Sequence, residues 1–262
     1  EIRTRTLGED HLRTLGVMGP LAVVLSNTGK LVEAEEILRK VLKGNQRVLG
    51  NRHMNTIVTM DALARLFRDL QKPDEARTLL EEALEISHDV LGKNHALTLG
   101  IRRDLVDLFR SQGMFSEAER ICEEILDIQR NALGMDNIEV LHTLYTQGSL
   151  YLQQDKPAEA EEVFTLGIEI ANRILPATHS RKAALYVGQG TCLSLQDRYR
   201  EAESYLLQGY EMNRSLLGDN HSRTQEAVRL IVELYESWEK LDQVEAWREK
   251  QLPLPSTTGE ME

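Results

Sequence analysis

The sequence contains little cysteine and few aromatic residues, and each shortage excludes a class of protein. Only two cysteines, Cys122 and Cys192, occur among the 262 residues, which is too few for a disulfide framework or a multi-cysteine metal site. This cysteine usage is typical of a reducing compartment, so we expect a cytoplasmic location. Aromatic residues make up 5 % of the chain, whereas good helix formers are abundant, which favours helices over β-sheet.

Positive charge is also scarce, and long apolar runs are missing. The 31 basic residues are outnumbered by 42 acidic ones, which gives a net charge of −11. A chain with this charge repels polyanions, so we expect neither nucleic acid nor a membrane surface as a partner. No apolar run approaches the length of about 18 residues that a membrane span needs. The chain starts without Met and without an apolar leader, which predicts a piece of a longer protein with no signal peptide.

A period of 42 residues runs through the chain without insertion or deletion. A Leu-Gly pair marks each repeat, with Leu-Pro in the fifth place: Leu7-Gly8, Leu49-Gly50, Leu91-Gly92, Leu133-Gly134, Leu175-Pro176 and Leu217-Gly218. Six repeats therefore run from residue 7 to about residue 252, and together with 1–6 they form one array over 1–252. Residues 1–6 are expected to be the end of a truncated helix, and 253–262 a disordered tail.

Each repeat has the apolar spacing of two amphipathic helices. In the second repeat, apolar residues recur at steps of three and four, first at Ile57, Met60, Leu63, Ala64 and Phe67, then at Ala76, Leu79, Leu80, Ala83 and Leu84. This spacing places one apolar stripe on each helix. In the first repeat we expect helices at about 12–27 and 31–48. Pro73 and Pro157 fall at the start of a second helix, where proline is well tolerated.

The pattern of small and large residues resembles the tetratricopeptide repeat. Its first helix carries a small residue (Ala22, Ala64, Gly148, Gly190), and its second helix carries Ala with Leu or Phe four residues later (Ala34 and Leu38, Ala160 and Phe164). The segments LGEDHLRTL, LGNRHMNTI and LGKNHALTL are similar to the LGxxHPxTL loop of kinesin-light-chain repeats, which also occur in multidomain signalling proteins. The resemblance implies an all-α, right-handed superhelical solenoid of antiparallel helix pairs, whose first helices line a concave groove for protein partners.

The histidines predict a structural role and not a metal site. Five of the seven occupy one position in the repeat, and Asn137 takes it in the remaining repeat: His11, His53, His95, His179 and His221. Metal ligands must converge on one point, whereas these residues are separated by whole repeats. We expect them to satisfy free backbone groups where the first helix of each repeat begins.

No pattern of a catalytic site or a cofactor site is present in the sequence. Phosphate-binding loops, zinc-protease motifs and nucleophile elbows are all missing. Cys122 and Cys192 fall at apolar positions, so we expect buried, inert thiols. The recurring acidic pairs, such as Glu35-Glu36 and Glu161-Glu162, indicate a solvated face. We therefore expect neither an enzyme nor a bound metal or cofactor.

Two glutamines interrupt an otherwise apolar position of the first helix. Leu21, Leu63 and Leu105 are followed at this position by Gln147 and Gln189. Because a buried amide must be paired, we expect these two to hydrogen-bond to each other or to nearby backbone. Their repeats should be locally softer than the second and third repeats.

Candidate binding residues lie at the groove-facing positions of the first helices. These are Arg65 and Arg68 in the second repeat, Arg103, Asp107 and Arg110 in the third, and His142, Tyr145 and Ser149 in the fourth. Neighbouring acids such as Asp61 stand four residues from some of these arginines, so pairs within one helix are an equally good interpretation. Arg68 and Arg110 have no acid four residues earlier, which makes them better candidates for an incoming carboxylate.

The favoured function is that of a protein–protein interaction scaffold, which binds an extended peptide or a partner helix in the groove. Its partner is a protein or peptide, with acidic character matched to the arginines. The alternative is a regulatory or assembly arm that docks on another domain of its own parent protein or self-associates. A small signalling molecule is disfavoured, because the pattern predicts no closed apolar pocket.

Overall fold

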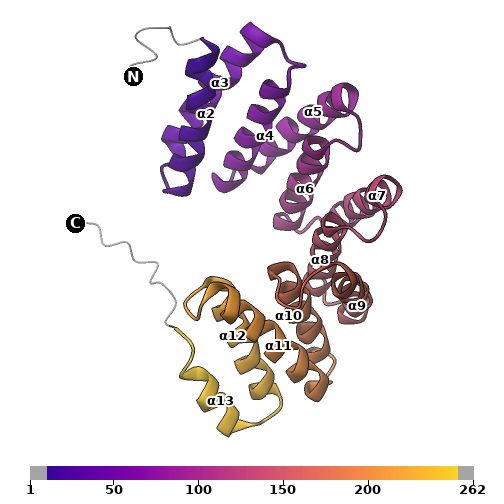
Figure 1. The fold of residues 1–262 in the computed structure, drawn as a ribbon. Helices are drawn as coiled ribbons and strands as arrows, with labels where there is room; N and C mark the ends of the chain where they lie inside the picture. The colour runs from indigo at the N-terminus through magenta and orange to yellow at the C-terminus, as the bar shows by residue number, and fades with distance from the viewer. Residues whose placement is uncertain (1–10, 253–262) are drawn as a thin grey trace, which may run out of the picture. The chain divides into compact units, whose positions relative to one another are not determined.

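The computed structural model describes residues 11–252, and Figure 1 shows that part of the chain as a succession of helices. The twelve helices in this range are α2 (Leu12–Asn27), α3 (Leu31–Leu49), α4 (Met54–Asp69), α5 (Pro73–Leu91), α6 (Ala96–Ser111), α7 (Phe115–Leu133), α8 (Ile138–Gln153), α9 (Pro157–Ile174), α10 (Ser180–Ser194), α11 (Tyr199–Leu217), α12 (Ser222–Ser237) and α13 (Leu241–Arg248). No strand occurs in this range. The helix expected at 1–6 and the tail expected at 253–262 lie outside the described residues.

The helices alternate as the period predicts. The even-numbered helices, here called A helices, begin the repeats, and the odd-numbered ones, here called B helices, complete them. The chain folds as two compact units, residues 1–128 and 129–262, here called the N-terminal unit and the C-terminal unit. Within the units, α2, α4, α8, α10 and α12 each pack on the B helix of their own repeat, and neighbouring A helices of one unit also touch. The all-α prediction is thus confirmed.

Histidine and asparagine side chains begin the A helices, as predicted. The Nδ1 atom of each repeat-marker histidine, or the Oδ1 atom of Asn137, accepts the backbone N–H two residues later over 2.8–3.2 Å. A helix start leaves such donors without intrahelical partners, so each cap stabilises the helix that follows it. This role accounts for five of the seven histidines.

The turn from each A helix to its B helix requires a left-handed backbone. One residue at the same position of all six repeats has φ between 57° and 81°: Gly29, Gln71, Gly113, Asp155, Asp197 and Glu239. Only two of the six are glycine, although glycine adopts this conformation without steric cost. The turn geometry is therefore imposed by helix packing, and the local residue follows it.

Ion pairs tie successive B helices together through the first carboxylate of two acidic pairs, whereas the second members, Glu36 and Glu162, are exposed as the solvated-face interpretation predicts. The Nζ of Lys72 lies 2.8 Å from Glu35. At the same positions three repeats later, Arg198 bonds Glu161 at 2.7 Å. The hydrogen bond from Lys72 lowers the pKa of the Glu35 carboxyl. These carboxylates are largely buried, with 14 % and 24 % of their side chains exposed. They link neighbouring repeats.

The two interrupting glutamines are buried, but the bonds expected of them are incomplete. Gln147 and Gln189 are 8 % and 3 % exposed, close to Leu63 at the same position in an earlier repeat. The Oε1 of Gln189 has no hydrogen-bond partner, so the expected pairing of this atom is wrong. Leu21 at this position is 49 % exposed, because no described helix precedes α2 to cover it.

Candidate functional site

The arginines of the N-terminal unit lie on neighbouring A helices and contact acidic residues. Arg65 on α4 is 3.1 Å from Asp61, one turn earlier, and 3.9 Å from Asp104 on α6. The alternative of pairs within one helix is therefore realised for Arg65. The second contact joins α4 to α6, which the spacing in the sequence did not indicate.

Arg68 and Arg110 also have acidic partners, although neither has an acid four residues earlier. Arg68 lies 3.5 Å from Asp69 and 3.9 Å from Asp107 of the next A helix, while Arg110 lies 3.4 Å from Asp107. Arg103 is not free either. The structure thus brings the five candidates of this unit into one charged surface across α4 and α6.

A carboxyl pair lies at the edge of this charged surface. Asp61 is 6 % exposed, and its Oδ1 has no hydrogen-bond partner. Burial, together with a hydrogen bond and repulsion from Asp61, raises the pKa of Asp104 to about 7. Repulsion between the two carboxyl groups disfavours their double ionisation, so Asp104 is partly protonated near neutral pH.

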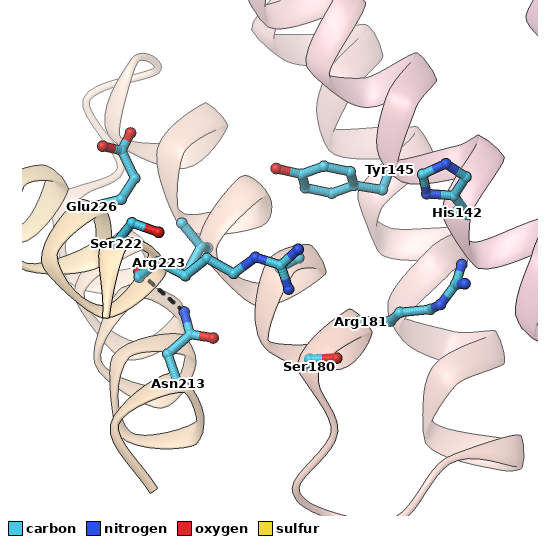
Figure 2. A pocket seen from close by; sticks show the side chains of 10 residues that line it. His142, Tyr145, Ser180, Arg181, Asn213, Ser222, Arg223 and Glu226 are labelled. Atoms are coloured by element: carbon cyan, nitrogen blue, oxygen red, sulfur yellow. Dashed lines mark hydrogen bonds between the residues drawn. The ribbon is translucent and has the colours of Figure 1, made fainter. Parts of the chain in front are cut away.

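The C-terminal unit contains a pocket of about 660 Å³ on its A-helix face. Its lining comes from α8, α10, α11 and α12 and combines polar side chains with apolar surface: His142, Tyr145, Ser180, Arg181, Ala184, Val187, Asn213, Ser222, Arg223 and Glu226 (Figure 2). Two of the predicted residues, His142 and Tyr145, belong to it. Ser149 does not line it and instead donates its hydroxyl to the backbone oxygen of Tyr145 at 2.8 Å.

Two arginines at equivalent positions face this pocket. Arg181 lies 3.6 Å from Glu139 and donates to the backbone oxygen of Ile138 at 3.2 Å. Arg223, one repeat later, has no acidic partner among residues 11–252. Its neighbour Glu226 is held instead by Arg229 at 2.5 Å. Arg223 is thus a cation directed at the pocket and left uncompensated.

Asn213 supplies the pocket with a buried oxygen that lacks a donor. Only 3 % of the residue is exposed, and its Nδ2 donates to the backbone oxygen of Arg223 at 3.3 Å. Its Oδ1 has no partner. An unsatisfied buried acceptor costs free energy in a folded protein, and this one belongs to a residue that lines a pocket.

Sequence reasoning missed the pocket residues on α10, α11 and α12, although a signal was present. The tripeptide His-Ser-Arg occurs at 179–181 and again at 221–223, one period apart. In both tripeptides the histidine caps an A helix, and the arginine lies in the first turn of that helix. The convergence of the two arginines on one pocket depends on how α10 and α12 pack, which no spacing within a helix reveals.

Metal-ligating side chains are scattered over the described part of the chain, and both of its thiols are buried. No cluster of three or more such side chains occurs among the described residues. Burial raises the pKa of the Cys122 and Cys192 thiols to about 12, so neither forms a thiolate readily. None of the helices in the described range combines the length and the apolar character that crossing a membrane requires.

Comparison with known families gives one consistent match. A sequence model described as tetratricopeptide repeat matches residues 13–88, 64–130 and 97–173, and a second with the same description matches residues 190–223. These matches span well over half of the chain. No curated protein sequence matches it.

Solved structures give the same match at the level of the fold. Nearly identical kinesin-light-chain TPR-like repeats from Podosopora anserina share 22 % identity, over 77 % of this chain and 95 % of that one, with a TM-score of 0.68. BtubC (BKLC) from P. vanneervenii shares 15 % identity, over 88 % and 97 % of the two chains, with a TM-score of 0.73. A signal transduction ATPase from Pyrococcus horikoshii, which carries a tetratricopeptide repeat sensor, shares 14 % identity over 91 % of this chain and 35 % of that one, with a TM-score of 0.73.

Proposed function

This chain belongs to the tetratricopeptide repeat family, and from that premise we propose that its A-helix face holds an extended acidic peptide or a partner helix. Repeats of this family serve protein–protein interaction and are generally not enzymes, so the chain is an interaction scaffold. Recognition of a peptide by side chains on rigid helices requires no cofactor. A cytoplasmic location stays our expectation from the cysteine usage.

The observation that carries the proposal is the loose pairing of the arginines on α4 and α6. Arg65, Arg68 and Arg110 keep 47 %, 31 % and 35 % of their side chains exposed. Except for the bond between Arg65 and Asp61, their acidic contacts span 3.4–3.9 Å. Strong charge-assisted hydrogen bonds are shorter, about 2.7–2.9 Å. The guanidinium groups therefore retain donors for the carboxylates of a peptide.

A display library of random peptides, selected against the purified chain, tests the proposal. We expect selected peptides to be enriched in Asp and Glu, and their binding to weaken as salt rises, because the arginines are open to water. Arg68→Ala and Arg110→Ala should each weaken binding about 10-fold or more, the range for a charge-assisted hydrogen bond.

Arg77→Ala is the matched control for these variants. Arg77 is 44 % exposed and ion-paired with Glu81, but it lies on the B helix α5. Its replacement should leave peptide binding unchanged. Selected peptides without acidic enrichment, or equal affinities for Arg68→Ala, Arg110→Ala and Arg77→Ala, would move peptide recognition away from this surface.

Exposed apolar side chains on α2 favour assembly as the second candidate function. Val17, Leu21 and Val24 are 44 %, 49 % and 57 % exposed, and their spacing places them on one side of the helix. A stripe of this kind fits docking on another domain or on a second copy. In the Pyrococcus horikoshii ATPase the repeats are a sensor within a larger chain. Sedimentation over a range of concentrations tests self-association, which Leu21→Ser should abolish.

A further inference from the structure

We infer that the pocket of the C-terminal unit is a subsite for one acidic residue of an extended peptide. Arg223 binds the side-chain carboxylate of that residue, and the Oδ1 of Asn213 accepts a backbone N–H from the same segment. The inference rests on the proposed function, because it names a residue that the A-helix face selects. It needs none of the arginines of the N-terminal unit.

Arg223 supplies the charge for this recognition. Figure 2 shows its side chain reaching from α12 toward the middle of the pocket, while the Tyr145 ring points inward from α8. Most arginines of the described residues contact an acid, whereas Arg223, like Arg200, has no acidic partner among them. A planar guanidinium binds a carboxylate through two parallel N–H···O bonds, a geometry that lysine does not offer.

Arg181 strengthens the positive potential of the pocket without being fully neutralised. The equivalent positions of three successive A helices hold Glu139, Arg181 and Arg223. Glu139 lies beside Arg181 at 3.6 Å, and Glu226, the acid that lines the pocket, pairs with Arg229. Arg223 therefore keeps an unpaired charge, which a carboxylate that enters the pocket neutralises.

Asn213 imposes a second requirement, because its oxygen needs a donor and not another anion. The repeat shows how this need is met elsewhere in the chain. Gln129, at the position of Asn213, accepts from the Thr143 hydroxyl at 3.0 Å, whereas Asn45 at the same position donates from its Nδ2 to the Thr59 hydroxyl. Ala227 stands where those threonines stand. The buried oxygen of Asn213 thus lacks the donor that Thr143 gives Gln129.

An acidic residue within a peptide meets both requirements at once. It carries a carboxylate for Arg223, and an amide N–H beside it for the Oδ1 of Asn213. A simple dicarboxylate has the first group and lacks the second, so it leaves the buried acceptor without a donor at a cost in affinity. Val187 and Tyr145 add apolar surface against which the methylene groups of the residue pack.

Titration of the full chain with blocked tripeptides tests the inference. The probes are acetyl-Ala-Glu-Ala-amide, its Gln counterpart, and glutarate, which lacks an amide N–H. Binding is followed by heteronuclear NMR, at the side-chain amide of Asn213 and the guanidinium of Arg223. We expect the Glu peptide to bind at least 10-fold more tightly than either of the other two.

Three substitutions separate the two contacts. Arg223→Gln should weaken binding of the Glu peptide at least 10-fold, whereas Arg200→Gln should not change it. Arg200 is an equally unpaired, exposed arginine of the same unit, outside the pocket. Ala227→Thr introduces the hydroxyl that Thr143 donates to Gln129 two repeats earlier, so it should reduce the preference for the peptide over glutarate while the fold is kept. Asn213→Ala should also reduce the preference for the peptide over glutarate. Alanine suits this position, because Ala171 occupies it one repeat earlier.

Equal binding of the Glu peptide, the Gln peptide and glutarate would overturn the inference, as would an unchanged affinity of Arg223→Gln. If Arg223→Gln is the only variant that loses the preference for the Glu peptide, the site recognises charge alone and Asn213 has no role in binding. The library selection tests the proposed function separately, so its failure can be told apart from failure of this inference. If Arg68→Ala and Arg110→Ala bind selected peptides normally while Arg223→Gln does not, the N-terminal surface is excluded and the pocket stands.

Discussion

Asp104 is a carboxyl group held where its charge is disfavoured. Burial, with Asp61 beside it, raises its pKa to about 7, and the nearby Arg65 and Arg68 offset only part of that rise. When Asp104 is protonated, it can donate its proton to the Asp61 carboxylate, with which it shares a hydrogen bond. The pair therefore stabilises the contact between α4 and α6 only while that proton is bound.

Replacing Asp104 with Asn keeps a donor for Asp61 and removes the titration. A carboxyl group whose pKa is raised by folding contributes stability below its unfolded value, 3.8, and loses it as the pH rises through about 7. As the pH rises between these two pKa values, we expect Asp104→Asn to become more stable than the wild type. The difference in the free energy of unfolding should reach about 1–2 kcal/mol at pH 8. Urea denaturation at pH 5 and pH 8 measures the gain.

Asp107→Asn serves as the control for this titration. Asp107 lies on the same helix and is 43 % exposed. It contributes ion pairs to Arg68 and Arg110, so its loss should lower stability by the same amount at both pH values. A difference between Asp104→Asn and the wild type that does not change from pH 5 to pH 8 would show that the carboxyl pair does not titrate in this range.

At the scale of helices, α8 and α10 approach α9 closely because glycine faces Phe164 from both sides. A Cβ atom on Gly148 would lie 2.6 Å from the Phe164 ring, and one on Gly188 would lie 2.5 Å from it. Phe164 itself is completely buried. The ring fills the space that two missing side chains leave, so the three helices depend on one another.

Gly188→Ala should therefore destabilise the C-terminal unit by about 1–3 kcal/mol, the usual cost of overpacking a core. Gly100→Ala is the matched control, because Gly100 lies within helix α6 with open space around it. Since alanine favours a helix over glycine, that variant should gain about 0.5–1 kcal/mol. Urea midpoints compare the two, and adding Phe164→Leu should recover part of the loss in Gly188→Ala. A loss of equal size in both alanine variants would exclude the contact with Phe164 as the cause.

The helices were predictable because their signals are local. The capping histidines, the apolar stripes and the 42-residue period each act within one repeat, and the bounds expected for α2 and α3 agree with Leu12–Asn27 and Leu31–Leu49. The candidate site was predicted less well, because its contacts join different repeats. The approach of Asp107 to Arg68 and the open acceptor of Asn213 depend on how A helices pack side by side.

At the scale of the whole chain, stability should be unevenly distributed between the two units. In the N-terminal unit, the position that Leu63 and Leu105 occupy is filled by apolar side chains that are 2 % and 3 % exposed. In the C-terminal unit Gln147 and Gln189 fill it, and the Gln189 Oε1 is buried without a partner. Leaving such a group unsatisfied costs about 1–3 kcal/mol. Each repeat contacts only its neighbours, so the cost stays local.

Amide hydrogen exchange should accordingly be faster in α8 and α10 than in α4 and α6, because local opening needs less free energy there. Gln189→Leu removes the unsatisfied oxygen and should slow exchange in α10 and its neighbours, with no effect in the N-terminal unit. Leu63→Gln is the reciprocal change and should speed exchange in α4. Equal protection of the four wild-type helices, or exchange in α10 that Gln189→Leu leaves unchanged, would mean that the buried amide does not weaken its repeat.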